Sequence, residues 1–229
     1  MILIADCGST KIDWCLLNGS EKVAQIFTVG MNALMLTQEE MTERIKTELM
    51  PHIVSYKVDE IYYYGAGIIS EEIKNNVINA LKANIPTATK IEVDSDLLAA
   101  ARALCGHEPG IACIMGTGSN SCYYDGEKVV DNVSPLGYIL GDEGSGGNLG
   151  KRMITDYIRR NMPAKVYEKV GAELGHNNDE LLDIIYTKPF PNRFCAQYAK
   201  FIHDNLDFDP YFPELVTDAF HQFFKLIVT

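Results

Sequence analysis

The stretch IADCGSTK, residues 4–11, places an apolar segment directly before a carboxylate, a glycine and two hydroxyls. An apolar run of this kind is typical of a buried strand, and a glycine lets backbone N–H groups approach an anion closely. Ser9 and Thr10 add hydroxyl donors, while Asp6 offers a carboxylate to Mg²⁺ or its water shell. Taken alone, the stretch predicts either an ordinary tight turn or one half of a phosphate-binding site.

A later stretch repeats this pattern. Both GSTKIDWCLLNGSEKV, residues 8–23, and GSNSCYYDGEKV, residues 118–129, run from Gly-Ser through a strand to Asn-Gly or Asp-Gly and then Glu-Lys-Val. Asn-Gly and Asp-Gly pairs favour hairpins, and the matching order favours an internal duplication. Two glycine and hydroxyl loops at matching places therefore favour a phosphate clamp over two unrelated turns.

The order of elements supports a repeated α/β fold. Apolar patterns and caps predict strands at residues 1–5, 11–17, 21–28, 60–64 and 90–93, with helices at 37–50, 70–83 and from 96 onward. The order βββαβαβα then restarts with strands at 111–115, 121–124 and 127–130. Helices are expected at 145–161, 164–174, 179–186, 193–205 and 213–228. We expect two domains, residues 1–105 and 106–229.

Composition limits the classes of partner. The chain of 229 residues has a net charge of −11 and 47% apolar residues. An acidic chain without a basic face is not expected to bind nucleic acid, and it would repel a free polyphosphate that came without a metal ion. Neither a signal peptide nor a membrane span is evident, so we expect a cytoplasmic protein. The six cysteines form no Cys-x-x-Cys pair and are expected to be buried free thiols.

Three further positions carry chemistry. Asp96 follows a predicted strand and opens a helix, so it is either an N-cap or a general base that takes a proton from a substrate hydroxyl; Asp94 is a weaker candidate base. Asn32 interrupts an apolar run, either as a turn residue or as a donor and acceptor for a ligand. The stretch LGDEGSGGNLGKR, residues 140–152, fails the Walker A pattern at Ser145 and Arg152. It remains a glycine-rich loop whose carboxylates suit sugar hydroxyls.

Three of these motifs together resemble a known family. ADCGSTK at residues 5–11, MGTGSNS at 115–121 and LGDEGSGG at 140–147 resemble the sugar-kinase, Hsp70 and actin ATPase superfamily. Within it they are most similar to the N-acetylglucosamine kinases and their BadF-type ATPase relatives. The resemblance covers most of the chain to residue 152. It implies an actin-like ATPase fold, in which two ribonuclease-H-like lobes close on ATP, Mg²⁺ and a sugar.

The resemblance also implies roles for individual residues. Asp6 would be the metal-linked carboxylate, and Asp96 would be the base that deprotonates the 6-hydroxyl of the sugar. The implied ATP and phosphate contacts are Gly8, Ser9, Thr10, Lys11, Gly116, Thr117 and Gly118. The implied sugar contacts are Asn32, Gly65, Ser119, Asn120 and Asp142. The expected activity is ATP-dependent phosphorylation of an amino sugar, with N-acetylglucosamine as the first candidate.

The chain departs from the family pattern in two places. Cys7 stands where a glycine is common, and nothing after residue 213 matches the strand and glycine-rich loop that hold adenosine in the family. We therefore expect a second lobe that is incomplete at its C-terminus, with an exposed sheet edge that invites a homodimer. Two alternative functions stay open: the ATPase activator of a radical dehydratase, and a sugar-binding sensor without catalysis.

Overall fold

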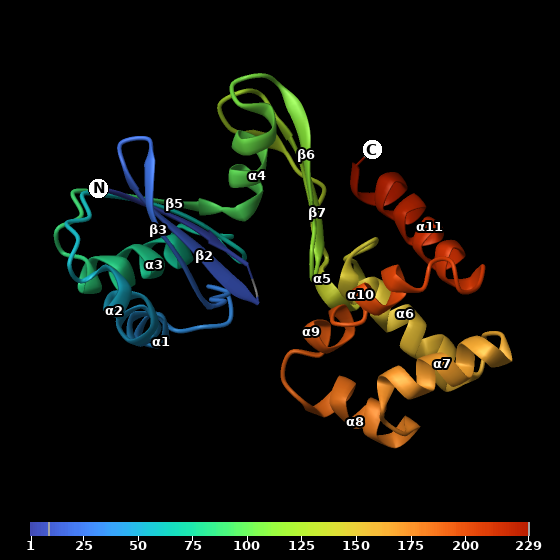
Figure 1. Cartoon of the computed structure of the whole chain (residues 1–229). Helices are drawn as coiled ribbons and strands as arrows, with labels where there is room; N and C mark the ends of the chain where they lie inside the picture. Colours follow the sequence, from blue (N-terminus) through green and yellow to red (C-terminus); the bar gives the residue numbers. More distant parts are fainter. Residues whose placement is uncertain (9, 229) are drawn as a thin grey trace. The chain divides into compact units, whose positions relative to one another are not determined.

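The structure is a computed structural model of the whole chain, and it describes residues 1–8 and 10–228 (Figure 1). The chain divides into two compact units. The first contains residues Met1–His107 together with Gly126–Lys128, and the second contains Glu108–Asp125 and Val129–Thr229. Each unit has its own sheet and its own cluster of buried apolar side chains.

The first unit is built on a mixed five-stranded sheet in the order β3-β2-β1-β4-β5. Its strands are β1 (Ile2–Cys7), β2 (Lys11–Asn18), β3 (Glu21–Val29), β4 (Glu60–Gly65) and β5 (Lys90–Ser95). The first three strands pair antiparallel, whereas β1, β4 and β5 run parallel. Because parallel strands end at the same edge, the loops that leave β1, β4 and β5 begin side by side.

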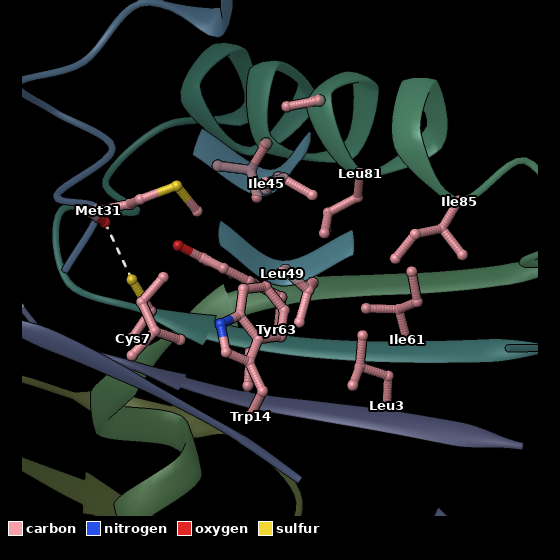
Figure 2. Close-up of a cluster of buried hydrophobic side chains, with 14 of the residues drawn as sticks. Leu3, Cys7, Trp14, Met31, Ile45, Leu49, Ile61, Tyr63, Leu81 and Ile85 are labelled. Atoms are coloured by element: carbon pink, nitrogen blue, oxygen red, sulfur yellow. Dashed lines mark hydrogen bonds between the residues drawn. The ribbon is translucent and has the colours of Figure 1, made fainter. Parts of the chain in front are cut away.

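Helices bury one face of this sheet. They are α1 (Gln38–Arg44), a π-helical turn at Ile45–Leu49, α2 (Met50–Ile53) and α3 (Glu71–Asn84). Figure 2 shows the resulting core, in which Leu3, Trp14 and Tyr63 of the sheet lie among Ile45, Leu49 and Leu81 of the helices. The predicted helix starts are confirmed, since Thr37 forms a capping box with Glu40 and Ser70 caps α3.

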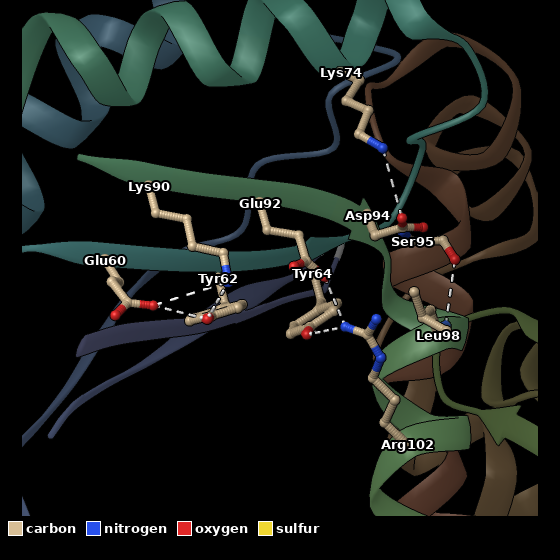
Figure 3. A network of polar contacts seen from close by, with 10 residues as sticks. All are labelled: Glu60, Tyr62, Tyr64, Lys74, Lys90, Glu92, Asp94, Ser95, Leu98 and Arg102. Carbon is tan, nitrogen blue, oxygen red and sulfur yellow. Dashed lines mark hydrogen bonds and ion pairs between the residues drawn. The ribbon is translucent and has the colours of Figure 1, made fainter. Parts of the chain in front are cut away.

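The opposite face of the first sheet carries polar and aromatic side chains. Figure 3 shows Tyr62 and Tyr64 of β4 on this face, where α4 (Asp96–Cys105) packs. Arg102 of α4 donates to the Tyr64 hydroxyl at 2.6 Å and to Glu92 at 2.7 Å. These contacts fix α4 against β4 and β5, and so they fix the first residue of that helix at the sheet edge.

The second unit combines a small antiparallel sheet with a group of helices. The sheet order is β6-β7-β8, with β6 (Gly110–Met115), β7 (Ser119–Tyr124) and β8 (Val129–Asp131). The helices are α5 (Gly137–Leu140), α6 (Gly146–Arg159), α7 (Ala164–Leu174), α8 (Asn178–Thr187), α9 (Pro191–Ala196), α10 (Ala199–Asp204), α11 (Tyr211–Phe223) and a final π-helical turn, Phe224–Val228. The Ser121 hydroxyl of β7 donates to the Ile227 carbonyl, which fixes that final turn on the sheet.

Several predictions about elements need correction. In the second sheet, the strand expected at 121–124 begins at Ser119, and the strand expected at 127–130 is Val129–Asp131. The helix expected over residues 193–205 is broken into α9 and α10, and the backbone turns where the Tyr198 amide donates to the Cys195 carbonyl at 3.2 Å. This turn buries the Tyr198 ring, which meets Phe194 edge-on. The first strand was expected to end at residue 5 but continues to Cys7, because Asp6 pairs with neighbours on both sides. Among the described residues, no helix combines the length and apolar character needed to span a membrane.

Candidate active site

The carboxyl edge of the first sheet gathers several of the predicted residues. Cys7, Gly65 and Ser95 are aligned as Cα partners across β1, β4 and β5. Asp6 precedes Cys7 and Asp96 follows Ser95, so both carboxylates belong to the same edge of the sheet. In open α/β sheets, ligands bind in the crevice outside the carboxyl ends of parallel strands. This edge is therefore the candidate active site of the first unit.

The structure corrects the expected cap of α4. Ser95, not Asp96, is the N-cap, and its hydroxyl accepts a hydrogen bond from the Leu98 amide at 3.3 Å. Serine can take this position because its short side chain reaches back to the third residue of the helix. Asp96 is the first helical residue, and its carboxylate accepts from the Leu97 amide at 2.9 Å. Asp96 is thus not needed as the cap.

Asp94 and Asp96 have different surroundings. Figure 3 shows the Asp94 carboxylate facing Lys74, with a shortest N–O distance of 3.6 Å. Asp94 also accepts a hydrogen bond from the Ser95 amide. Asp96, in contrast, has no ion pair with any of the described residues. The distinction favours Asp96 over Asp94 as a base, because a base that is already paired with a cation binds a proton less readily.

Burial and charge both act on Asp96. Burial raises the pKa of the Asp96 carboxyl above its ordinary value; the hydrogen bond from the Leu97 amide opposes this increase, and the nearby charge of Asp6 adds to it. Asp6 itself is exposed at the end of β1. A half-buried carboxylate beside an exposed one is an arrangement suited to proton transfer, because a raised pKa makes a stronger base.

The loop between β1 and β2, which sequence patterns predict to bind phosphate, is a tight turn. The Gly8 amide donates to the Lys11 carbonyl at 3.0 Å, and the Gly30 amide donates to the Thr10 carbonyl at 3.0 Å. Ser9, the expected hydroxyl donor of this loop, lies outside the described residues. The Lys11 ammonium lies 5.4 Å from the centre of the Phe27 ring. The turn therefore forms as predicted, while its lysine is held over an aromatic side chain of β3.

Asn32 lies in a loop of the first unit that fits closely against the loop after β4. Its side-chain oxygen accepts from the Leu34 amide at 3.0 Å, and its carbonyl accepts from the Met35 amide at 2.9 Å. Gly67 has a φ of 82°, and a Cβ there would collide with the Asn32 side-chain oxygen. Only a glycine therefore permits this approach. Asn32 is therefore a turn residue, and its role toward a ligand stays a prediction.

In the second unit, the loop after β6 and the glycine-rich loop lie against each other. The Gly146 amide donates to the Gly116 carbonyl at 2.8 Å, and the Gly147 amide donates to the Thr117 carbonyl at 3.1 Å. Ser145 caps α6 by accepting from the Asn148 amide. The loop after β6 and the glycine-rich loop are therefore joined by hydrogen bonds, although they are separate motifs in the sequence.

Asp142 and Ser119 meet within this loop pair. The Ser119 amide donates to the Asp142 carboxylate at 3.3 Å, and the Ser119 hydroxyl donates to the Glu143 carbonyl at 2.7 Å. Asp142 has a φ of 61°, a conformation that aspartate tolerates better than most residues. Burial raises the pKa of the Asp142 carboxyl. Both side chains are buried and make contacts within the loop pair.

The Asn120 side chain, predicted to contact the sugar, already makes hydrogen bonds within the protein. Its side-chain oxygen accepts from the Asn132 side chain at 2.8 Å and from the Ser121 amide at 2.9 Å. These contacts fix the start of β7 beside the segment after β8. Sequence patterns gave no sign of Ser95, Glu143 or Asn132 in these supporting roles, because each acts through a contact that only the fold creates.

Comparison with known proteins identifies the wider group. No family model matches the chain, and neither does any curated protein sequence. Among solved structures, one from Porphyromonas gingivalis, named a "putative N-acetylglucosamine kinase", is 41% identical with a TM-score of 0.95; the match covers 100% of this chain and 81% of that one. A protein of the same name from Chromobacterium violaceum is 17% identical with a TM-score of 0.78, over 98% of this chain and 81% of that one.

More distant matches concern the fold alone. MreB5 of Spiroplasma citri, solved with ADP, is 12% identical with a TM-score of 0.51, over 74% of this chain and 61% of that one. The sheets of the two units, the first mixed and the second antiparallel, and these similarities agree with the expected actin-like ATPase fold. With 41% identity over its full length to the Porphyromonas protein, the chain belongs to the N-acetylglucosamine kinase family.

Proposed function

We propose that the chain transfers the terminal phosphoryl group of ATP to the 6-hydroxyl of N-acetylglucosamine, with Asp96 as the general base. The observation that carries this proposal is the alignment of β1, β4 and β5, which brings Asp6 and Asp96 to one edge of the first sheet. The family relationship supports a sugar kinase in general. The choice of sugar, of hydroxyl and of base is our own inference.

Asp96 is assigned the proton-transfer step. The attacking sugar oxygen must lose its proton as the new O–P bond forms, and a carboxylate within hydrogen-bond reach can accept it. Burial and the nearby charge of Asp6 raise the pKa of Asp96, which strengthens it as a base. Because Ser95 caps α4, the carboxylate of Asp96 is not committed to holding the helix.

Glycine-rich turns are assigned to the phosphates. Phosphoryl transfer depends mainly on positioning and on stabilising negative charge. We propose that backbone N–H groups and hydroxyls around Gly8, Thr10 and Lys11 in the first unit bind phosphate oxygens, and that Gly116, Thr117 and Gly118 do so in the second. Ser9 is part of this proposal from sequence alone.

The residues at the sheet edge fit a magnesium ion. Mg²⁺ prefers hard oxygen ligands, keeps several waters, and is usually held by one or two carboxylates plus the phosphates of the substrate. The exposed Asp6 carboxylate, with Asp96 beside it, meets this requirement, and the described residues contain no larger cluster of metal-binding side chains. Asp6 would hold the ion directly or through water. When bound, the ion would neutralise charge on the phosphates, which the acidic chain does little to offset itself.

Sugar recognition is assigned to polar groups in both units. We propose Asn32 and Gly65 as sugar contacts from the first unit, and Ser119, Asn120 and Asp142 from the second. Asp142 is the strongest of these candidates, because a carboxylate accepts charge-assisted hydrogen bonds from sugar hydroxyls. Ser119 and Asn120 already make internal hydrogen bonds, so we expect them to contribute mainly by shaping the loop.

A sugar panel tests the proposed function. The chain is incubated with ATP and Mg²⁺ plus N-acetylglucosamine, glucose, glucosamine or no sugar, and ADP release is recorded. ADP release that requires N-acetylglucosamine, with N-acetylglucosamine 6-phosphate identified by mass spectrometry and NMR, is the expected result. Equal ADP release without sugar would instead favour an activator-type ATPase. Sugar binding without any ADP release would favour a sensor.

A further inference from the structure

We infer that Cys7 is a positioning residue whose thiol holds the Asn32 loop in the conformation that receives the sugar. The inference rests on the proposed function for its sugar, and on the structure alone for the coupling between Cys7 and the loop. Cys7 is the last residue of β1, directly before the first phosphate loop. Neither its motif nor its position in the sequence points to such a role.

Cys7 connects three loops at the edge of the first sheet. Its own chain continues into the turn at Gly8. Its carbonyl accepts from the Ala66 amide at 2.9 Å, in the loop after β4. Its thiol donates to the Met31 carbonyl at 3.0 Å, as the dashed line in Figure 2 shows. One residue thereby joins the segments that carry Gly8, Gly65 and Asn32.

The Cys7 thiol and the Met31 carbonyl form a buried hydrogen bond. Cys7 is fully buried and Met31 is almost so. A buried backbone carbonyl needs a hydrogen-bond partner, and among the described residues the Cys7 thiol is the partner found for Met31. The Tyr63 hydroxyl, buried on the same face of the sheet, adds to this enclosed setting.

The position of Met31 determines the position of Asn32. Asn32 follows Met31 directly and accepts the amides of Leu34 and Met35, so its backbone and side chain form one compact turn. That turn fits tightly against Gly67. Because the Asn32 turn is packed closely against Gly67, a small movement of the Met31 carbonyl displaces the Asn32 amide from its place at the sheet edge.

The test compares Cys7→Ala, which loses the donor, with Cys7→Ser, which keeps one. Cys15→Ala serves as the control, because Cys15 lies on β2 away from this loop. Hydrogen exchange is followed at the amides of Leu34 and Met35, while calorimetry and steady-state kinetics give the affinity for N-acetylglucosamine, KM and kcat. We expect Cys7→Ala to speed exchange at these amides by about fivefold to tenfold, the size of one lost hydrogen bond.

The same variant is expected to raise KM for the sugar by a similar factor and to change kcat by less than about twofold, because the loop positions the sugar without touching the reacting atoms. Cys7→Ser should restore both quantities most of the way, and Cys15→Ala should leave both unchanged. A purely structural role predicts instead an even rise in exchange across β1, β2 and β4 and no rescue by serine. That pattern would overturn the inference.

The two proposals fail in different ways. A wild-type chain that binds none of the sugars would overturn the proposed function, and the sugar part of this inference with it. The exchange rates of Leu34 and Met35 in Cys7→Ala would still decide the coupling between Cys7 and the Asn32 loop. Unchanged exchange at these two amides, together with normal sugar binding in Cys7→Ala, would overturn the coupling and leave the proposed function intact.

Discussion

Burial raises the pKa of the Asp96 carboxyl, and the charge of Asp6 at the same carboxyl edge of the first sheet raises it further. These two carboxylates come from positions ninety residues apart in the sequence (6 and 96) and are brought together by the parallel pairing of β1, β4 and β5. Two like charges in one place lower the stability of the folded chain. Such an arrangement is typical of a functional site.

Asp96→Asn is expected to stabilise the folded chain at neutral pH. Because the folded-state pKa of Asp96 lies above the unfolded one, the folded chain binds this proton more tightly, and stability is lost as pH rises through the folded pKa. At pH 7 the variant should therefore unfold roughly 1–3 °C above wild type, a modest shift because solvent screens a half-buried carboxylate. The difference in melting temperature should disappear below about pH 4, where Asp96 of the wild-type chain is protonated in both the folded and the unfolded state.

Circular dichroism melts between about pH 3 and pH 8 measure this effect. Asp94→Asn is the matched control, because it removes a neighbouring carboxylate that faces Lys74, and it should gain no stability. An Asp96→Asn variant that melts below wild type at pH 7 would show that the carboxylate is stabilised by contacts other than those described.

Gly67→Ala is expected to weaken sugar binding. Gly67 has a φ of 82°, and an added Cβ would collide with the Asn32 side chain. Gly19→Ala is the control: Gly19 also has a positive φ, of 60°, but no heavy atom lies within 4 Å of the added Cβ. Both variants should lose about 1 kcal/mol of stability from backbone strain. Only Gly67→Ala should also lose at least about tenfold in affinity, measured by calorimetry with N-acetylglucosamine, because misplaced polar contacts are costly. Equal affinities of the two variants would argue against a sugar-binding role for the Asn32 loop.

Two substitutions at Asp142 distinguish the effect of backbone strain from the effect on sugar binding. At a φ of 61°, asparagine is tolerated and alanine is strained. Asp142→Asn should melt no lower than wild type, because burial raises the pKa of this carboxyl. It should reduce sugar affinity by about tenfold, since it loses charge-assisted hydrogen bonds. Asp142→Ala should lose both stability and affinity. An Asp142→Asn variant with wild-type affinity would remove Asp142 from the list of sugar contacts.

We expect the chain to self-associate through β6, an edge strand of the second sheet. The edge strands of the first sheet carry charges, such as Lys22 on β3 and Lys90 on β5, which oppose edge-to-edge pairing. Strand β6 carries none, and its Ile111 side chain is 55% exposed. Ile111→Lys should therefore lower light scattering at high protein concentration. Val23→Lys, on the already charged β3, should change it little; equal effects of the two lysines would point to a general effect of charge.

Much of the architecture could be predicted from local sequence. The capping box at Thr37 and the cap at Ser70 mark helix starts because their side chains bond amides only three residues away. Asn-Gly and Asp-Gly marked both hairpins for the same reason, since the turn chemistry is local. The repeated motif predicted that both sheets open with a hairpin, and β1–β2 and β6–β7 confirm this.

These local patterns could not predict contacts between distant segments. Asp96 looked like a helix cap because aspartate and serine are both good caps, and only the backbone path shows that Ser95 takes the position. The helix over residues 193–205 is broken by the burial of Tyr198, a tertiary effect. The bond from Cys7 to Met31 joins residues 24 positions apart and leaves no mark in either local pattern. The sequence could propose residues for the site, but it could not say which of them already serve the fold.

The central claim, that Asp96 is the base of a sugar kinase, is tested most directly by comparing wild type with Asp96→Asn. Turnover is measured as ADP release with N-acetylglucosamine and Mg²⁺, and sugar affinity is measured by calorimetry on the same preparations. Turnover is expected to fall by at least about a hundredfold, the usual contribution of a general base, while affinity stays within a few-fold. Near-wild-type turnover in Asp96→Asn would rule out Asp96 as the base.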